Sequence, residues 1–133
     1  MTDQQRIRAF LDGGPHAVVG ASRDPSKYGN MVLRAYVQND LPVFPVNPNA
    51  DIVEGLKSYP DLESLPEPVH GVSVITPPHV TDSIIEQAGR LGIRHIWLQP
   101  GAEAEHNVQR ALQLGMNIIA GGPCLLVALR FRQ

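Results

Sequence analysis

The chain has little of several features that would assign it to a specialised class of protein. It holds one cysteine among 133 residues, Cys124, so no disulfide can form within it and a reducing, cytoplasmic location is expected. The charges nearly balance, with 11 Lys and Arg against 13 Asp and Glu, so there is no broad positive field to recruit nucleic acid. No run of about 18 apolar residues offers a membrane span, and the polar start of the chain lacks the apolar stretch of a secretory signal. We therefore expect neither a nucleic-acid partner nor a membrane partner.

What the chain has instead is a regular alternation of short apolar runs and amphipathic stretches. The hydrophobic share is 43% and the charged share 18%, which is typical of a globular protein, and the length predicts a single domain over residues 1–133. The apolar runs predict strands, and the stretches with apolar side chains three and four positions apart predict helices. The strands are expected in residues 16–20, 42–46, 71–75, 93–98 and 116–120, and the helices in 4–12, after Gly29, in 76–92, 103–114 and 123–131.

This alternation predicts an α/β fold with a doubly wound parallel sheet. Strands that alternate with helices form right-handed βαβ units, and near-continuous apolar strands are typical of a sheet that is covered on both faces. We expect a Rossmann-like sheet of about five strands with helices on both faces and the strand order 3-2-1-4-5, to which the first helix is an addition.

Loops rich in glycine, proline and small polar residues follow every predicted strand. A doubly wound sheet binds its ligand outside the carboxyl ends of the strands, at the switch point beside the first strand. Five such loops on one edge therefore predict a ligand site at that edge. They comprise residues 20–23, 46–48, 75–78, 98–101 and 121–124.

The loop after the first strand has the composition of a phosphate-binding turn. Gly20 permits a sharp turn, Ser22 offers a hydroxyl donor, and Gly29 lets the following helix approach closely. Arg23 and Lys27 add positive charge, so the helix N-terminus and the two cations together predict a pyrophosphate cradle. The alternative is a tight strand-to-helix connection with two solvated basic side chains.

The sequence departs from the fingerprint of a dinucleotide-binding oxidoreductase. Position 22 is serine where the second glycine of G-x-G-x-x-G would stand, and the second strand ends at Asn47 rather than at an acidic residue for the ribose. These departures disfavour NAD as a hydride-transfer cofactor, although Asn47 can still bond an adenosine group. After the third strand, Thr76 is expected to cap a helix that Pro77 and Pro78 begin, and the same loop is expected to lie against the ligand.

Taken in order, these segments resemble the small CoA-binding proteins, whose domain is similar to the nucleotide-binding domain of the succinyl-CoA synthetase alpha subunit. The resemblance covers nearly the whole chain, and the ordered set is more specific than any one motif. It rests on residues 19–22 with Pro25 and Gly29, on 43–48, on Gly55 with Tyr59 and Pro60, and on 76–78, 97–101 and 115–124. The chain departs from the family at Gly122-Pro123-Cys124, where many members have Asp-Arg-Cys, and is there closer to the synthetase.

The resemblance implies that the chain binds coenzyme A, or an acyl-CoA, through the ADP-like part of that ligand. The first loop would hold the phosphates, the second would lie near the adenosine end, and the third would border the ligand. The residues implied are Gly20, Ala21, Ser22, Arg23 and Lys27, then Asn47 and Pro48, then Thr76, Pro77 and Pro78. The synthetase also needs a phosphohistidine domain and a second subunit, for which we expect this chain to have no room, so the resemblance implies a sensor, carrier or regulatory module.

Two further functions stay open beside a non-catalytic module. Cys124 is the candidate nucleophile of an enzyme that uses a nucleotide or an acyl-CoA, because a thiol at a helix N-terminus can be reactive, although a packing role is the plainer interpretation. The histidines show no metal-ligand spacing, and no Ser/His/Asp set or carboxylate pair emerges. We expect His79 near the ligand loops and His16, His70 and His95 at the opposite edge. The third interpretation is a protein-interaction module with a vestigial pocket.

Overall fold

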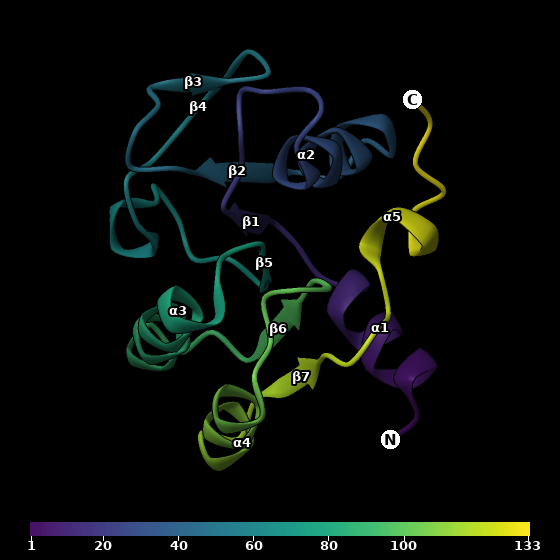
Figure 1. Ribbon diagram of the computed structural model, residues 1–133, viewed down its shortest axis with the longest axis vertical. Coiled ribbons are helices and arrows are strands. Elements are labelled where there is room, and N and C mark those ends of the chain that lie inside the picture. The colour runs from purple at the N-terminus through teal and green to yellow at the C-terminus, as the bar shows by residue number, and fades with distance from the viewer.

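The computed structural model describes residues 1–133 and contains a five-stranded parallel sheet between two layers of helices (Figure 1). The sheet consists of β1 (His16–Val19), β2 (Val43–Val46), β5 (Gly71–Val74), β6 (His95–Leu98) and β7 (Asn117–Ile119). The strands β3 (Ile52–Val53) and β4 (Leu56–Lys57) form a separate antiparallel hairpin that is not among the predicted strands. The helices are α1 (Asp3–Leu11), α2 (Tyr28–Gln38), α3 (Pro78–Arg90), α4 (Glu105–Gln113) and α5 (Leu125–Ala128), with the short 3-10 helix η1 (Leu62–Ser64).

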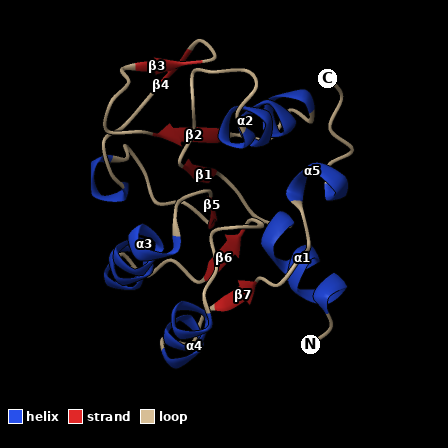
Figure 2. Ribbon diagram, viewed as in Figure 1, coloured by secondary structure: helices blue, strands red, loops and turns tan.

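Helices cover both faces of the sheet, which confirms the predicted doubly wound α/β architecture (Figure 2). On one face the core is closed by α3, α4 and η1, and on the other by α1, α2 and α5. Alternate side chains of β1 serve the two faces, since Ala17 and Val19 belong to the first cluster and Val18 to the second. All four residues of β1 are buried, as expected for an inner strand of a covered sheet.

The strand order is β2-β1-β5-β6-β7, which contradicts the predicted order 3-2-1-4-5. When β5, β6 and β7 are numbered as the third, fourth and fifth predicted strands, the observed order is 2-1-3-4-5. The strand β5 pairs with β1, which leaves β2 at an edge of the sheet. Pro45 gives the physical reason: it lies within β2, has no backbone N–H for a ladder, and is tolerated at an edge but not in an inner strand. The switch point therefore lies between β1 and β5, and still beside the first strand as predicted.

The helix boundaries differ from the predicted ones mainly at the C-terminal end of the chain. The helix expected in residues 123–131 is limited to the four residues of α5. Arg130 adopts a φ of 52°, a left-handed conformation that does not continue a helix. No helix of the chain combines the length and the apolar character that crossing a membrane requires.

Candidate functional site

A hollow of about 310 Å³ opens at the carboxyl ends of β1, β2 and β5, on the side of the sheet that α3 covers. The loop after β1 contributes Gly20, Ala21 and Ser22, the loop after β2 contributes Asn47 and Pro48, and the loop after β5 contributes Thr76. The remaining wall comes from strand ends, from the segment before η1 and from α3, with Val19, Val46, Pro60, Asp61, Val80, Ile84 and Gln87. Six of the ten predicted site residues thus line one hollow at the switch point.

The other four predicted residues lie outside this hollow. Arg23 lines a shallow neighbouring hollow together with residues 48–52, and the two hollows share Pro48. Lys27 is exposed and directly precedes α2, while Pro77 and Pro78 begin α3, and none of these three lines either hollow. The structure therefore brings one cation to the rim of the site and leaves the other at a helix start.

Two glycines let the strand ends and the α2 N-terminus approach each other closely. Gly20 has a φ of 94°, and a Cβ built on it would lie 2.0 Å from the carbonyl oxygen of Ile75. A Cβ on Gly29 would in turn lie 2.0 Å from the carbonyl oxygen of Gly20. Real Cβ atoms do not approach backbone oxygens so closely, so both positions require glycine for this packing.

The loop after β1 is fixed by a buried asparagine that the sequence analysis missed. Asn30, in the first turn of α2, is fully buried, and its Nδ2 donates to the Ser22 carbonyl oxygen at 2.8 Å and to Glu54 Oε2 at 3.0 Å. Its Oδ1 accepts from Arg34 Nε at 2.7 Å, and Arg34 Nη2 donates to the Pro25 carbonyl at 3.1 Å. An asparagine in the first turn of a predicted helix, directly after a glycine-containing loop, is the sequence signal that could have identified this residue.

Within the same loop, the Ser22 hydroxyl oxygen accepts a hydrogen bond from the Asp24 backbone N–H at 3.1 Å. No side chain or backbone group of the protein accepts the proton of this hydroxyl, so Ser22 can still act as a donor. Asp24 accepts from both the backbone N–H and the hydroxyl of Ser26, and these bonds hold the pKa of its carboxyl below the usual value. The loop is therefore an ordered turn, closed by its own side chains.

Most polar side chains of the hollow are already engaged within the protein. Asn47 Nδ2 donates to the Ala21 carbonyl at 2.8 Å and its Oδ1 accepts from the Asn49 N–H at 2.8 Å, so it joins two loops. Asp61 caps η1 through Ser64, whose N–H and hydroxyl both bond to Asp61 Oδ1. These bonds shape the hollow and leave less of these groups for a ligand.

The expected helix cap at Thr76 is absent. Pro77 occupies the N-cap position of α3 without any side-chain hydrogen bond, and Thr76 Oγ1 instead bonds Thr81 Oγ1 at 2.8 Å. The reason is that the helix begins one residue later than the pattern predicts, so the hydroxyl of Thr76 faces a side chain of the first full turn. Thr76 nevertheless lines the hollow, as expected of this loop.

A second polar cluster lies where α2 and α5 begin, near the carboxyl end of β6. The Tyr28 hydroxyl bonds to the Cys124 thiol and donates to Gln99 Oε1 at 3.4 Å, and the Leu125 backbone N–H donates to the same oxygen at 3.0 Å. Burial is the main cause that raises the pKa of Tyr28. Cys124 therefore stands at the N-cap of α5 as predicted, half-buried and hydrogen-bonded to a tyrosine.

The histidines of the strand starts lie at the opposite edge of the sheet, as predicted. His16 and His70 stack with ring centroids 5.8 Å apart, and His70 and His95 with centroids 4.2 Å apart. Burial is the main cause that lowers the pKa of His16 from 6.5 to about 4. No group of three or more His, Cys, Asp or Glu side chains is arranged to hold a metal ion.

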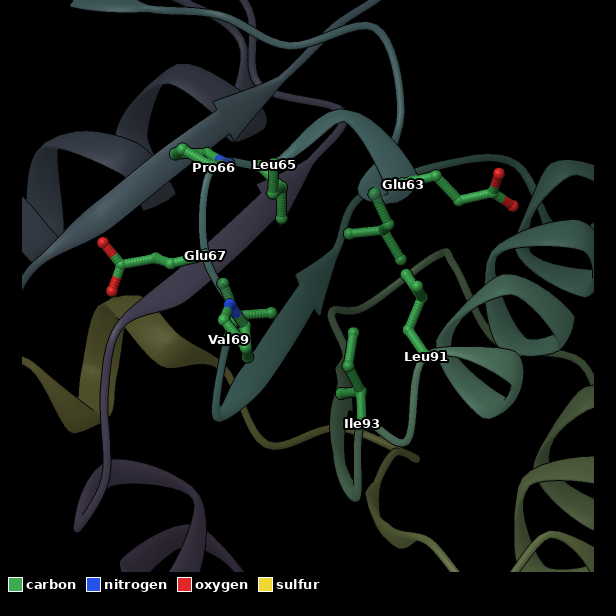
Figure 3. A pocket seen from close by; sticks show the side chains of 9 residues that line it. Glu63, Leu65, Pro66, Glu67, Val69, Leu91 and Ile93 are labelled. Atoms are coloured by element: carbon green, nitrogen blue, oxygen red, sulfur yellow. The ribbon is translucent and has the colours of Figure 1, made fainter.

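A second apolar hollow, of about 310 Å³, lies at this opposite edge and offers a poor site for a phosphate (Figure 3). Leu65, Val69 and Ile93 are among the side chains that surround it, while the carboxylates of Glu63 and Glu67 point to opposite sides. Its lining holds two glutamates and no basic side chain, whereas Arg23 lines a hollow that adjoins the first one through Pro48. Glu63 also pairs with Arg90 at 3.2 Å, which leaves Glu67 as the carboxylate that would repel an anion there.

Comparison with known proteins associates the chain with coenzyme A. Residues 16–130 match the model of a family described as "CoA binding domain". An ADP-forming acetate–CoA ligase of Archaeoglobus fulgidus is 32% identical over 80 residues, which are 59% of this chain and 12% of the ligase. The chain thus spans about an eighth of this curated relative.

Solved structures share the fold over most of the chain. A conserved hypothetical protein from Pyrococcus furiosus is 37% identical, with a TM-score of 0.80 over 85% of this chain and 97% of that one. A dinucleotide-forming acetyl-coenzyme A synthetase of Ca. Korarchaeum cryptofilum is 29% identical, with a TM-score of 0.74 over 86% of this chain and 27% of that one.

Proposed function

Because the chain belongs to the family of CoA-binding domains, we propose that it binds coenzyme A as a non-catalytic module, with the ADP-like part of the ligand at the carboxyl ends of β1, β2 and β5. The observation that carries this proposal is the single hollow to which three separate loops contribute glycine, proline and small polar residues. Ligands of doubly wound sheets bind at such switch points. The predicted CoA-binding resemblance agrees with the family match, although the curated relative is an acetate–CoA ligase rather than a succinyl-CoA synthetase.

Within the site, we assign the adenosine end to the hollow and the phosphates to its rim. Val46, Pro48, Val80 and Ile84 give the hollow apolar walls that suit a flat purine ring. The backbone amides of residues 20–22, the Ser22 hydroxyl, and the cations Arg23 and Lys27 would then meet the phosphates. This assignment keeps all ten predicted residues within or beside the proposed site, with Pro77 and Pro78 bordering it through the loop after β5.

An enzyme that uses a nucleotide or an acyl-CoA is the second candidate, and one observation favours it. The Cys124 thiol is half-buried and bonded to the Tyr28 hydroxyl at the start of α5, so it is held in one place. Selective alkylation of Cys124 that CoA prevents would support this candidate. A protein-interaction module with a vestigial pocket is the third, and it predicts no CoA binding at all. We further propose a single domain in the cytoplasm, since a lone cysteine suits a reducing compartment.

Calorimetry with CoA at low and moderate salt tests the leading proposal, with NAD, ATP and dephospho-CoA as competitors. The wild type should bind CoA in the micromolar range, and affinity should fall as salt rises because phosphates dominate the contacts. Arg23→Ala and Lys27→Ala should each weaken binding by about fivefold to tenfold. Arg8→Ala removes the same charge from α1 and serves as the control, with unchanged affinity expected. A preference for NAD or ATP, or no binding, would contradict the proposal.

A further inference from the structure

One polar side chain of the hollow has an unsatisfied acceptor. Gln87, on α3, lines the hollow, and its Oε1 atom is buried without any hydrogen-bond partner. Three other polar side chains there are engaged, since Asn47 bonds two loops, Asp61 caps η1 and Thr76 bonds Thr81, while Ser22 accepts from the Asp24 N–H and keeps its proton for a donor role. A buried acceptor without a partner is destabilising, and a turn of the terminal amide that brings this oxygen to a donor on a ligand would relieve it.

The surroundings of Gln87 fit a flat, apolar ring with polar atoms at one edge. Ile84 precedes Gln87 by three positions on the same face of α3, and Val80 lies one turn earlier, so apolar side chains lead up to the terminal amide. Val46, Pro48 and Pro60 add further apolar lining to the same hollow. The last side-chain torsion of glutamine is soft, so the amide can turn its oxygen or its NH₂ group into the hollow.

A glutamine amide matches the edge of adenine in both hydrogen-bonding senses. Its oxygen accepts from the exocyclic 6-amino group, and its NH₂ group donates to N7, which is the bidentate pairing by which proteins distinguish adenine. Hypoxanthine carries a 6-oxo group in that place, so O6 and N7 are both acceptors and neither orientation of the amide can pair with both. Building on the proposed CoA function, we propose that Gln87 is the specificity-determining residue that selects adenine at the base end of the ligand.

The test compares the affinity for CoA with the affinity for its analogue in which hypoxanthine replaces adenine. The wild type should prefer CoA by about tenfold or more, the range expected for one bidentate base contact. Gln87→Met keeps the length and shape of the side chain without its hydrogen-bonding groups. This variant should bind CoA about tenfold more weakly and bind both ligands nearly equally.

Two controls separate the possible failures. Gln109→Ala changes an exposed glutamine on α4, outside the hollow, and should leave both affinities unchanged. A helical circular-dichroism spectrum and melting curve like the wild type would show that Gln87→Met folds; Gln87→Ala provides a second variant with the same expected loss of preference. If the wild type binds both ligands equally, or Gln87→Met keeps the preference, the role of Gln87 is wrong while CoA binding stands. If the wild type binds neither, both proposals fail together.

Discussion

At Gly20, the carbonyl oxygen of Ile75 occupies the space that the Cβ of any other residue would need. The Gly20→Ala substitution places a Cβ in a left-handed conformation and within 2.0 Å of the Ile75 carbonyl oxygen. We expect it to lower the free energy of unfolding by about 2–4 kcal/mol and to abolish CoA binding, because β1 and β5 must move apart at the site. Gly121→Ala is the matched control: its φ is 83°, but nothing lies within 4 Å of its Cβ. Urea unfolding of both variants measures the difference, and equal losses would contradict a role for close packing at Gly20.

Asn30 acts on the site through the loop that it holds. In Asn30→Ala the Ser22 carbonyl and Glu54 each lose a donor, so we expect a loss of about 1–3 kcal/mol in unfolding free energy. CoA affinity should fall as well, since the Ser22 hydroxyl and the amides of residues 20–22 lose their fixed positions. Asn39→Ala serves as a comparison, because Asn39 ends the same helix and bonds backbone carbonyls far from the hollow. A similar loss of CoA affinity in both variants would mean that general destabilisation of α2, rather than the loop, is responsible.

The first helix is attached to the sheet by histidines of the strand starts. His16 Nε2 donates to the Phe10 carbonyl and His70 Nε2 to the Ala9 carbonyl, both at 2.9 Å, at the end of α1 where carbonyls lack helical partners. Burial lowers the pKa of His16 to about 4, so in the folded state it stays neutral between pH 6.5 and 4 while the unfolded chain takes up a proton.

Stability should therefore decrease as the pH falls through that window. Between pH 7 and pH 5 we expect the unfolding free energy to decrease by about 2 kcal/mol through His16 alone. Denaturant unfolding at both pH values measures it. His16→Gln keeps a donor for the Phe10 carbonyl without a titrating group, and should show a smaller decrease. A wild type whose stability is unchanged between these pH values would contradict the lowered pKa.

At the level of elements, the sequence predicts which strands form the sheet better than it predicts the order of those strands. All five strands of the sheet were expected because apolar runs and their turns are local signals. The strand order depends on which strand pairs with β1, which is not a local property. Pro45 is the local signal that could have shown β2 to be an edge strand. Three of the loops that the sequence singles out do line one hollow, whereas the lining residue Gln87 was not expected there, because its access to the hollow depends on how α3 packs. The spacing of three residues between Ile84 and Gln87 places both on one face of the helix, and this is the sequence signal that could have shown the position of Gln87.

For the molecule as a whole, a ligand that binds only the folded state must stabilise it. CoA at about 100 times its dissociation constant should raise the unfolding free energy by about 2.7 kcal/mol and, for a chain of this size, the Tm by about 10 °C. Pantetheine, which lacks the ADP-like part, should give a much smaller increase at the same concentration. Equal increases with both ligands would contradict recognition through the nucleotide part.

The location of the ligand can be measured directly by titrating the isotope-labelled chain with CoA and following its backbone amide signals by NMR. Binding at the switch point predicts the largest shifts at Gly20, Ser22 and Thr76, and little change at His70 and His95 on the opposite edge. Largest shifts around the hollow of Leu65 and Ile93, or no shift at all, would contradict CoA binding at the carboxyl ends of the strands.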